Sequence, residues 1–401
     1  MDTGHTVNQK IDEMAVKIGT WPNEPLRIAE EHFDELLQWC AHQRASDVTV
    51  QTDRPVYIEV DGILFPITRR SLDSADIANV LAKLYGPDAL AKLASGRDLD
   101  LSYEIRPDRN TRLRFRVNIT AVMSRGRDSV QVTLRVLPSL PPTLADLGIE
   151  QPIIDNWSPR QGLVLITGPT GSGKTTLLAA GCRMLVEREE GCGKMLTYEA
   201  PIEYVYDAIS GPHSLVAQSE IPRHLPTFAA GVRNALRRKP NIILVGEARD
   251  RETVMAAIEA GQTGHLVFST VHTIGVAATI RRMVSVFEPG ERSERAFAMM
   301  ETLRMVVTQT LVPRVGGGRI GMREFMVFNE KVREKLLDMP IERWTTEIQK
   351  LLPKHGQPME VTATKAFKGG VIDRRTFLFL TKGFSDGDED DFDESIETDE
   401  I

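Results

Sequence analysis

One octapeptide constrains the fold more than any other segment of this sequence. Residues 168–175 read Gly168-Pro-Thr-Gly-Ser-Gly-Lys174-Thr175, directly after the apolar run GLVLIT and directly before a helical pattern. The spacing matches G-x-x-x-x-G-K-[ST], in which glycines let backbone N–H groups surround phosphate oxygens at a helix N-terminus. A strand, a glycine-rich turn and a helix in this order are typical of parallel α/β domains. The segment therefore predicts a nucleotide-binding α/β domain.

The sequence around this loop alternates between short apolar runs and helical patterns. Apolar runs occur in KMLTYEA, NIILVGEA and HLVFSTVH, with helices expected from 174, near 226–238 and near 251–261. Such alternation predicts a mostly parallel sheet with helices on both faces. Further on, we expect helical segments over about 275–312 and 331–382, with a hairpin through Gly316-Gly317-Gly318.

The first third of the chain shows a different pattern. Apolar residues recur at helical spacing over 30–44, and a second helix is expected around 75–95. Apolar and polar residues alternate between them, with an Asp61-Gly62 turn, and further strands are expected near 99–105, 112–122 and 129–137. The organisation we expect is a flexible leader (1–25), an α+β domain (26–137), a proline-rich linker (138–150), a nucleotide-binding domain with a helical C-terminal part (151–384) and a disordered acidic tail (385–401).

Composition limits the class of protein. The chain has 401 residues, 41% of them hydrophobic, and a net charge of −7. Residues 385–401 hold ten acidic residues and no Lys or Arg, so the rest of the chain is nearly neutral. This tail is either solubilising or a docking site for a basic partner. Because the sequence has no apolar run of about 18 residues and no signal-peptide pattern, we expect an intracellular chain.

The glycine-rich loop predicts binding of ATP with Mg²⁺. Lys174 is expected to reach the β- and γ-phosphates, and the hydroxyl of Thr175 to be a ligand of Mg²⁺. The residues expected to hold the nucleotide are Gly168, Thr170, Gly171, Ser172, Gly173, Lys174, Thr175 and Thr176.

Glutamates at strand ends favour hydrolysis over phosphate transfer to a second substrate. Glu247 follows the apolar strand of NIILVGEARD, where a carboxylate can polarise water directly or through Mg²⁺. Glu199 ends the strand KMLTYEA, and strand C-termini line the ligand crevice of parallel sheets. Glu203 lies beyond a proline and either joins this chemistry or fixes the loop.

Two histidines bracket the strand in TGHLVFSTVHT. His272, at its end, is a candidate donor to the γ-phosphate, whereas His265 at its start is equally well explained as structural. We expect no zinc, because no cysteine or further histidine lies nearby at ligand spacing. The three cysteines (Cys40, Cys182, Cys192) are expected to be reduced and structural.

Four segments resemble, in order, the Walker A, Asp-box, Walker B and His-box motifs of the secretion and pilus-retraction ATPase superfamily. They are GPTGSGKTT, TYEAPIEYVYD, ILVGEARD and TGHLVFSTVHT. RASDVTVQT and RLRFRVN extend the resemblance into the first domain. QSEIPRHLPTFAAGVRNALRRKP and KHGQPM are similar to the Dot/Icm branch, of the DotB type, and to its conjugative-plasmid relatives of the TraJ type. Glu199-Ala200-Pro201 departs from the usual Glu-Asp-Pro in the way that this branch does.

The resemblance implies a fold class and a set of arginines. The fold class is α/β, with a RecA-like P-loop ATPase domain preceded by a smaller α+β, PAS-like domain. Members form hexameric rings in which N-terminal arginines contact the nucleotide, and the matching positions are Arg116 and Arg135. Arg114 is a further candidate, since Arg112, Arg114 and Arg116 share one face of a strand. An exposed basic strand is the alternative explanation.

The implied function is an ATP-hydrolysing hexameric motor for type IVB secretion or conjugative transfer. We expect it to be cytoplasmic and held at the inner membrane by the machinery proteins that are its partners. Pilus retraction is the main alternative, because it uses the same motifs. A DNA translocase and an ATP-sensing adaptor are further alternatives, although a nearly neutral body argues against direct nucleic-acid binding.

Overall fold

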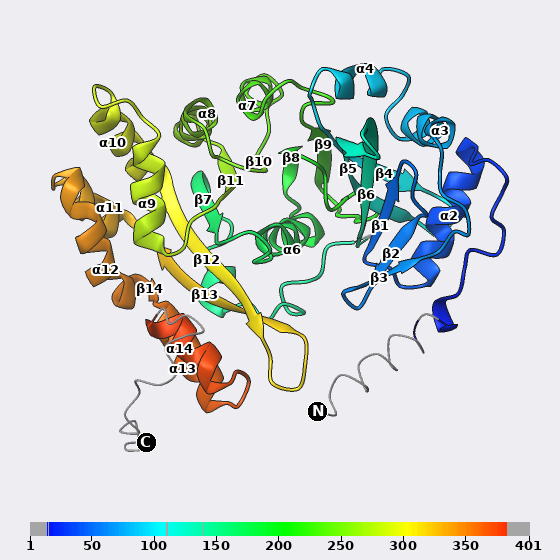
Figure 1. Ribbon diagram of the computed structural model, residues 1–401. Coiled ribbons are helices and arrows are strands. Elements are labelled where there is room, and N and C mark those ends of the chain that lie inside the picture. The colour runs from blue at the N-terminus through cyan, green and yellow to red at the C-terminus, as the bar shows by residue number, and fades with distance from the viewer. Residues whose placement is uncertain (1–13, 15, 110, 139, 383–401) are drawn as a thin grey trace. The chain divides into compact units, whose positions relative to one another are not determined.

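The computed structural model describes residue 14 and residues 16–109, 111–138 and 140–382 (Figure 1). The expected acidic tail and most of the expected leader lie outside the described residues. The chain forms two compact units. The first comprises residues up to Pro141 together with Ala200–Ala208 and Glu220–His224, and the second comprises Pro142–Glu199, Ile209–Ser219 and residues from Leu225 onward. Two short segments from the middle of the chain thus belong to the first unit.

The first unit contains a six-stranded sheet in the order β3-β2-β1-β6-β5-β4, and all its neighbouring strands are antiparallel. The alternating sequence explains this sheet, because one face is buried and the other is partly exposed. The expected strands are confirmed. They are β1 (Asp47–Gln51), β2 (Tyr57–Val60), β3 (Ile63–Pro66), β4 (Leu99–Ile105), β5 (Leu113–Ser124) and β6 (Arg127–Leu137).

This sheet packs with the helices α2 (Glu30–His42), α3 (Ser74–Leu84) and α4 (Ala89–Ala94). The helix expected around 75–95 is therefore two helices, with Gly86 at a positive φ of 116° between them. Trp21 is 2% exposed and belongs to the core, so the C-terminal part of the expected leader packs in this unit.

A buried carboxylate joins three segments of the first unit. Asp76 is 1% exposed and lies in the first turn of α3. It accepts hydrogen bonds from the Ile28 amide (2.8 Å) and from both terminal nitrogens of Arg70 (2.5 and 3.1 Å). The pairing satisfies a charge that would otherwise be costly to bury.

The second unit contains an eight-stranded sheet in the order β14-β13-β12-β7-β11-β10-β8-β9. Strands β12, β7, β11, β10 and β8 run parallel, and β13 and β14 are antiparallel to their neighbours. The middle strands are apolar and buried throughout, as expected for a sheet covered on both faces. Their bounds are β7 (Gly162–Thr167), β8 (Gly193–Glu199), β9 (Ser214–Glu220), β10 (Ile242–Val245), β11 (Leu266–Val271), β12 (Leu303–Pro313), β13 (Arg319–Val327) and β14 (Gly356–Gln357).

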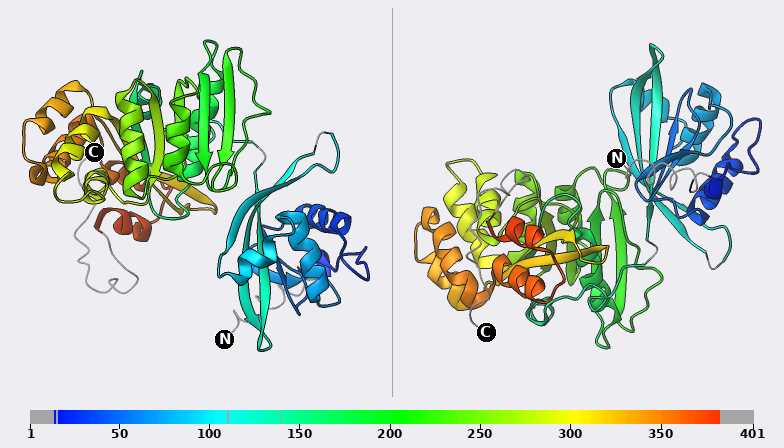
Figure 2. Two further views of the ribbon diagram at one scale, coloured as in Figure 1. Left: turned by 90° about the horizontal axis from the view of Figure 1, so that it is seen from above. Right: turned by 60° about the horizontal axis from the view of Figure 1, so that its bottom comes forward.

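Helices alternate with these strands, and α6 and α8 both pack on β7 and β11 (Figures 1 and 2). Asp250 and Thr227 cap two helices by accepting from the backbone amides of Thr253 and Ala230. The bounds are α5 (Gln151–Asp155), α6 (Lys174–Glu187), α7 (Phe228–Ala235), α8 (Arg251–Gln262), α9 (Val276–Ser285) and α10 (Arg292–Thr302).

The prediction of helix over about 275–312 is wrong at its C-terminal end. Helix α10 ends at Thr302, and β12 begins at Leu303 beside β7. Its β-branched residues suit a strand buried in the centre of a sheet. The expected hairpin is confirmed, because β12 and β13 pair antiparallel around Gly316-Gly317-Gly318.

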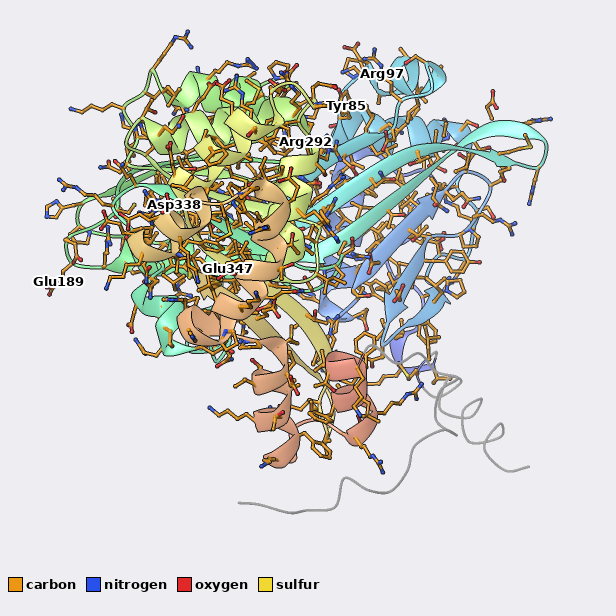
Figure 3. All side chains as sticks on the ribbon, turned by 90° about the vertical axis from the view of Figure 1, so that its left-hand side faces the viewer. Tyr85, Arg97, Glu189, Arg292, Asp338 and Glu347 are labelled. Carbon is orange, nitrogen blue, oxygen red and sulfur yellow. The ribbon has the colours of Figure 1, made fainter. Side chains whose placement is uncertain are left out.

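The C-terminal part is helical, as expected, apart from the short strand β14. Glu347 (labelled in Figure 3) pairs with Lys335 at 2.5 Å and so joins two of these helices. No helix within the described ranges is long and apolar enough to cross a membrane. The elements are α11 (Glu330–Leu337), η1 (Ile341–Arg343), α12 (Trp344–His355), α13 (Met359–Lys368) and α14 (Arg374–Lys382).

Candidate nucleotide site

The carboxyl ends of four parallel strands meet at one edge of the second unit's sheet. Val245 of β10 is in register with Tyr198 of β8 and Ser269 of β11, and Val271 of β11 is in register with Thr167 of β7. Gly168, Glu199, Glu247 and His272 follow these positions within two residues, so the site residues predicted from strand ends in this unit share one edge. Ligands of parallel sheets bind at this edge.

The glycine-rich loop runs from the end of β7 to the start of α6. The loop has positive φ values at Gly168 (144°), Gly171 (76°) and Gly173 (77°). Residues with a side chain disfavour this region of backbone conformation, whereas glycine adopts it readily. A Cβ at Gly168 would lie 2.1 Å from the Gln309 carbonyl oxygen, so only glycine fits there. At Gly171 a Cβ would meet nothing within 4 Å. The loop is therefore held tightly at its start and is open in its middle.

Polar groups of the loop fit a phosphate. The Ser172 hydroxyl is buried and has no hydrogen-bond partner among the residues that the structure describes. Lys174 is 7% exposed, and its Nζ lies 2.9 and 2.8 Å from the carbonyl oxygens of Gly168 and Pro169. Lys174 also begins α6, whose N-terminus carries partial positive charge. A lysine, a helix N-terminus and a buried hydroxyl without a partner among the described residues make this loop suited to an anion.

Glu247 and His272 lie close together at the same edge. The Glu247 carboxylate is 3.8 Å from His272 Nε2, and both side chains are partly exposed, at 27% and 46%. The backbone around Glu247 is held from both sides: the Gly246 amide donates to Tyr198 O, and the Ala248 amide donates to Thr270 O. The structure brings these two predicted residues together.

Glu199 ends β8, which pairs with β10, the strand that precedes Glu247. Its side chain is 7% exposed. Its Oε1 accepts hydrogen bonds from the Thr197 hydroxyl (2.6 Å) and from Gln218 Nε2 (3.1 Å). These donors orient a carboxylate that is nearly buried. Gln218 was not predicted as a site residue from the sequence. What could have indicated it is that it is polar and lies in the segment that follows the Asp box.

The arginine strand of the first unit contacts the segment Ala200–Ala208. Arg114 is 2% exposed and donates to the carbonyl oxygens of Ile202 (2.7 Å) and Glu203 (2.6 Å). Arg112 forms a two-pronged pair with Asp207, which holds the pKa of Asp207 below and that of Arg112 above its usual value. The Arg114 guanidinium thus meets acceptors of its own chain, which explains how it can be buried.

Arg116 and Arg135 are cross-strand partners on β5 and β6. Arg116 Nη1 lies 3.3 Å from a carboxylate oxygen of Glu203, and its side chain is 40% exposed. Arg135 pairs with Asp47 at 3.0 Å and is 67% exposed. Both guanidinium groups therefore reach solvent, unlike that of Arg114.

The structure does not bring His265 to the glycine-rich loop. His265 directly precedes β11, whereas the loop lies beyond the carboxyl end of the neighbouring strand. Its Nδ1 lies 3.1 Å from Ala260 O and 3.2 Å from the Thr263 hydroxyl. These contacts fit a histidine that closes the α8–β11 turn.

Comparison with known proteins places this arrangement in a family. The chain matches the family described as "Type II/IV secretion system protein" over residues 24–317. It is 35% identical to the type IV pilus retraction ATPase PilT of Pseudomonas aeruginosa, over 79% of this chain and 88% of that protein.

Solved structures agree with this assignment. The Legionella pneumophila ATPase DotB is 45% identical, with a TM-score of 0.87 over 92% of this chain and 100% of that chain. The pilus retraction motor PilT with bound ADP is 30% identical, with a TM-score of 0.76 over 90% and 99%. The expected superfamily and the expected α/β fold are confirmed. The chain therefore belongs to the type II/IV secretion system protein family and is an ATP-binding, ATP-hydrolysing enzyme of the secretion and pilus ATPases.

Proposed function

We propose that this protein is the motor of a type IVB secretion or conjugative transfer system. It acts as a homo-hexamer at the cytoplasmic face of the inner membrane, held there by proteins of that machinery. The observation that carries the proposal is the similarity to DotB, which is higher in identity (45% against 30%) and in TM-score (0.87 against 0.76) than the similarity to the PilT structure.

The residues of the second unit have distinct roles in the proposed reaction. Residues 168–176 hold the phosphates, with Lys174 on the β- and γ-phosphates. The Thr175 hydroxyl and the Glu247 carboxylate would hold Mg²⁺, because hard oxygen donors suit this ion. Mg²⁺ supplies neutralisation of charge on the phosphates. Glu247 and Glu199 orient and deprotonate the attacking water, and His272 donates to the γ-phosphate.

The first unit contributes cations to the proposed mechanism. Arg116 and Arg135 stabilise charge that develops on the γ-phosphate, an effect worth on the order of 10³-fold or more in rate. Their exposed guanidinium groups support this role. Arg114 donates to two carbonyl oxygens of the segment that follows Glu199, and the Glu203 carboxylate of this segment pairs with Arg116. For Arg114 and Glu203 we therefore propose a role in positioning this segment.

Pilus retraction is the second candidate, favoured by the 35% identity to PilT over most of both chains.

The machine served can be identified by capture. Glu247→Gln should bind ATP without hydrolysing it, so crosslinking in membranes should recover the partner machinery. The matched control is Glu252→Gln, because Glu252 is an exposed carboxylate that lies five residues after Glu247 in the chain. We expect secretion or conjugation coupling proteins and a hexamer with ATP. A pilus platform protein would favour retraction, and DNA alone would favour translocation.

A further inference from the structure

A chain of buried polar contacts in the second unit joins the phosphate loop to residues 147–150. Gln309 of β12 and Arg323 of β13 form its centre, and each is 3% exposed. We propose that Arg323 and Gln309 are positioning residues through which nucleotide at the phosphate loop changes the stability of residues 147–150. The proposal rests on the nucleotide site described above. We call the contacts of Arg323 and Gln309 the relay.

On the loop side, Gln309 Nε2 donates to the Ser172 carbonyl oxygen at 2.7 Å. Ser172 lies in the middle of the phosphate loop, next to the open position at Gly171. The backbone of Gln309 also lies against Gly168, because β12 runs beside β7 with Thr308 in register with Thr167. Any shift of the loop around a phosphate therefore acts directly on the Gln309 amide.

On the far side, Arg323 donates to residues that precede α5, the last of which, Glu150, is the N-cap of this helix. Its Nη2 donates to Leu147 O at 3.1 Å, and its Nη1 donates to Gly148 O at 3.4 Å and to a Glu150 carboxylate oxygen at 3.2 Å. Burial lowers the pKa of Arg323, while Glu150 acts in the opposite direction. A buried guanidinium is stable only while these acceptors stay in place.

The centre of the relay is a single hydrogen bond. Arg323 Nε donates to Gln309 Oε1 at 2.8 Å, and the two residues are directly opposite in the β12–β13 register. A Cβ at Gly321 would lie 2.8 Å from the Arg323 guanidinium and 3.2 Å from Gln309 Oε1. Glycine at this position leaves the space that the two side chains occupy.

One end of the relay contacts the phosphate loop, and the other contacts the segment that follows the first unit in the chain. Residues 142–150 follow the first unit directly in the chain, since the units divide between Pro141 and Pro142. Among them, the Ile149 amide donates to Leu144 O and the Gly148 amide donates to Ala145 O. Nucleotide binding should slow the opening of these bonds through the relay, and by reciprocity their opening should weaken nucleotide binding.

Hydrogen exchange of the full-length protein, with and without saturating Mg²⁺ and ADP, tests the relay. In the wild type, ADP should slow exchange at residues 144–150 by roughly 5- to 150-fold, the usual range of coupling between sites. Gln309→Glu keeps the acceptor for Arg323 but loses the donor to Ser172. Arg323→Met removes the contacts to residues 147–150. Both variants should lose most of the ADP effect even when calorimetry shows that ADP is saturating.

Arg304→Met is the matched control, because Arg304 also lies on β12 and its guanidinium donates to Glu301 O and Leu303 O, which are close to it in the chain. It should keep the wild-type effect. If Gln309→Glu saturated with ADP protects residues 144–150 as the wild type does, the relay is refuted. The same holds if wild type binds ADP without slowing exchange there. If wild type binds no ADP, the nucleotide site itself is refuted.

Discussion

Arg114→Met should destabilise the first unit far more than Arg116→Met, although the two arginines lie on one face of β5. The Arg114 guanidinium is buried and donates to the Ile202 and Glu203 carbonyl oxygens. The Arg116 side chain is 40% exposed, and its pair with Glu203 spans 3.3 Å.

The magnitude follows from the acceptors left behind. A buried acceptor that loses its donor costs about 1–3 kcal/mol. The Ile202 contact is fully buried and the Glu203 contact only partly, so we expect a total of about 2–4 kcal/mol for Arg114→Met. Methionine fills the space of the aliphatic stem, which keeps the loss of packing small. An exposed ion pair contributes about 0–1 kcal/mol, and this is the expected loss for Arg116→Met.

Thermal unfolding and hydrogen exchange at residues 200–208 of the full chain measure both effects. Arg114→Met should lower the melting temperature and speed exchange in this segment, while Arg116→Met should leave both nearly unchanged. Equal melting temperatures and equal exchange for the two variants would refute the reasoning, because the buried carbonyl oxygens would then have found other partners at no cost.

Two further predictions concern stability. Although burial acts to raise it, Arg70 and the amides of Ile28 and Asp73 hold the pKa of Asp76 below its ordinary 3.8. This stabilisation is present above pH 3.8 and lost as pH falls through the lower folded value, so Asp76→Asn should be less stable than the wild type at pH 7, and the difference should shrink as the pH falls below 3.8. A difference in melting temperature that stays constant with pH would contradict this. Gly181→Ala places a Cβ 2.0 Å from the Trp157 ring and should cost about 1–3 kcal/mol in chemical denaturation, whereas Gly290→Ala, with nothing within 4 Å, should be nearly neutral.

Local patterns predicted much of the second unit. The glycine-rich loop, Glu247 and His272 each follow an apolar run, and parallel strands bring their ends to one edge, so their proximity follows from the pattern alone. His265 could have been excluded by the same rule, because it precedes its strand. Strand β12 was mistaken for helix because the apolar run AFAMMETLRMVV continues from α10 without a turn signal.

Contacts between distant segments could not be predicted. Arg114 meets Ile202 across 88 positions of sequence, and Arg323 meets Leu147 across 176. The arginine face correctly indicated acceptors, but spacing cannot tell a phosphate from a backbone carbonyl oxygen. Gln309 gave a weak signal as a polar residue within an apolar strand, and its partner became clear only from the register of β12 beside β7.

Steady-state ATP turnover by the full-length protein with Mg²⁺ tests the assignment of the catalytic site most directly. Lys174→Ala removes the cation at the phosphates, and Glu247→Gln removes the carboxylate proposed to act on water. We expect each to lower turnover by about 10²-fold or more, while Glu252→Gln retains the wild-type rate. Turnover near the wild-type rate in Lys174→Ala or Glu247→Gln would contradict the assignment of this loop and this strand end as the site of hydrolysis.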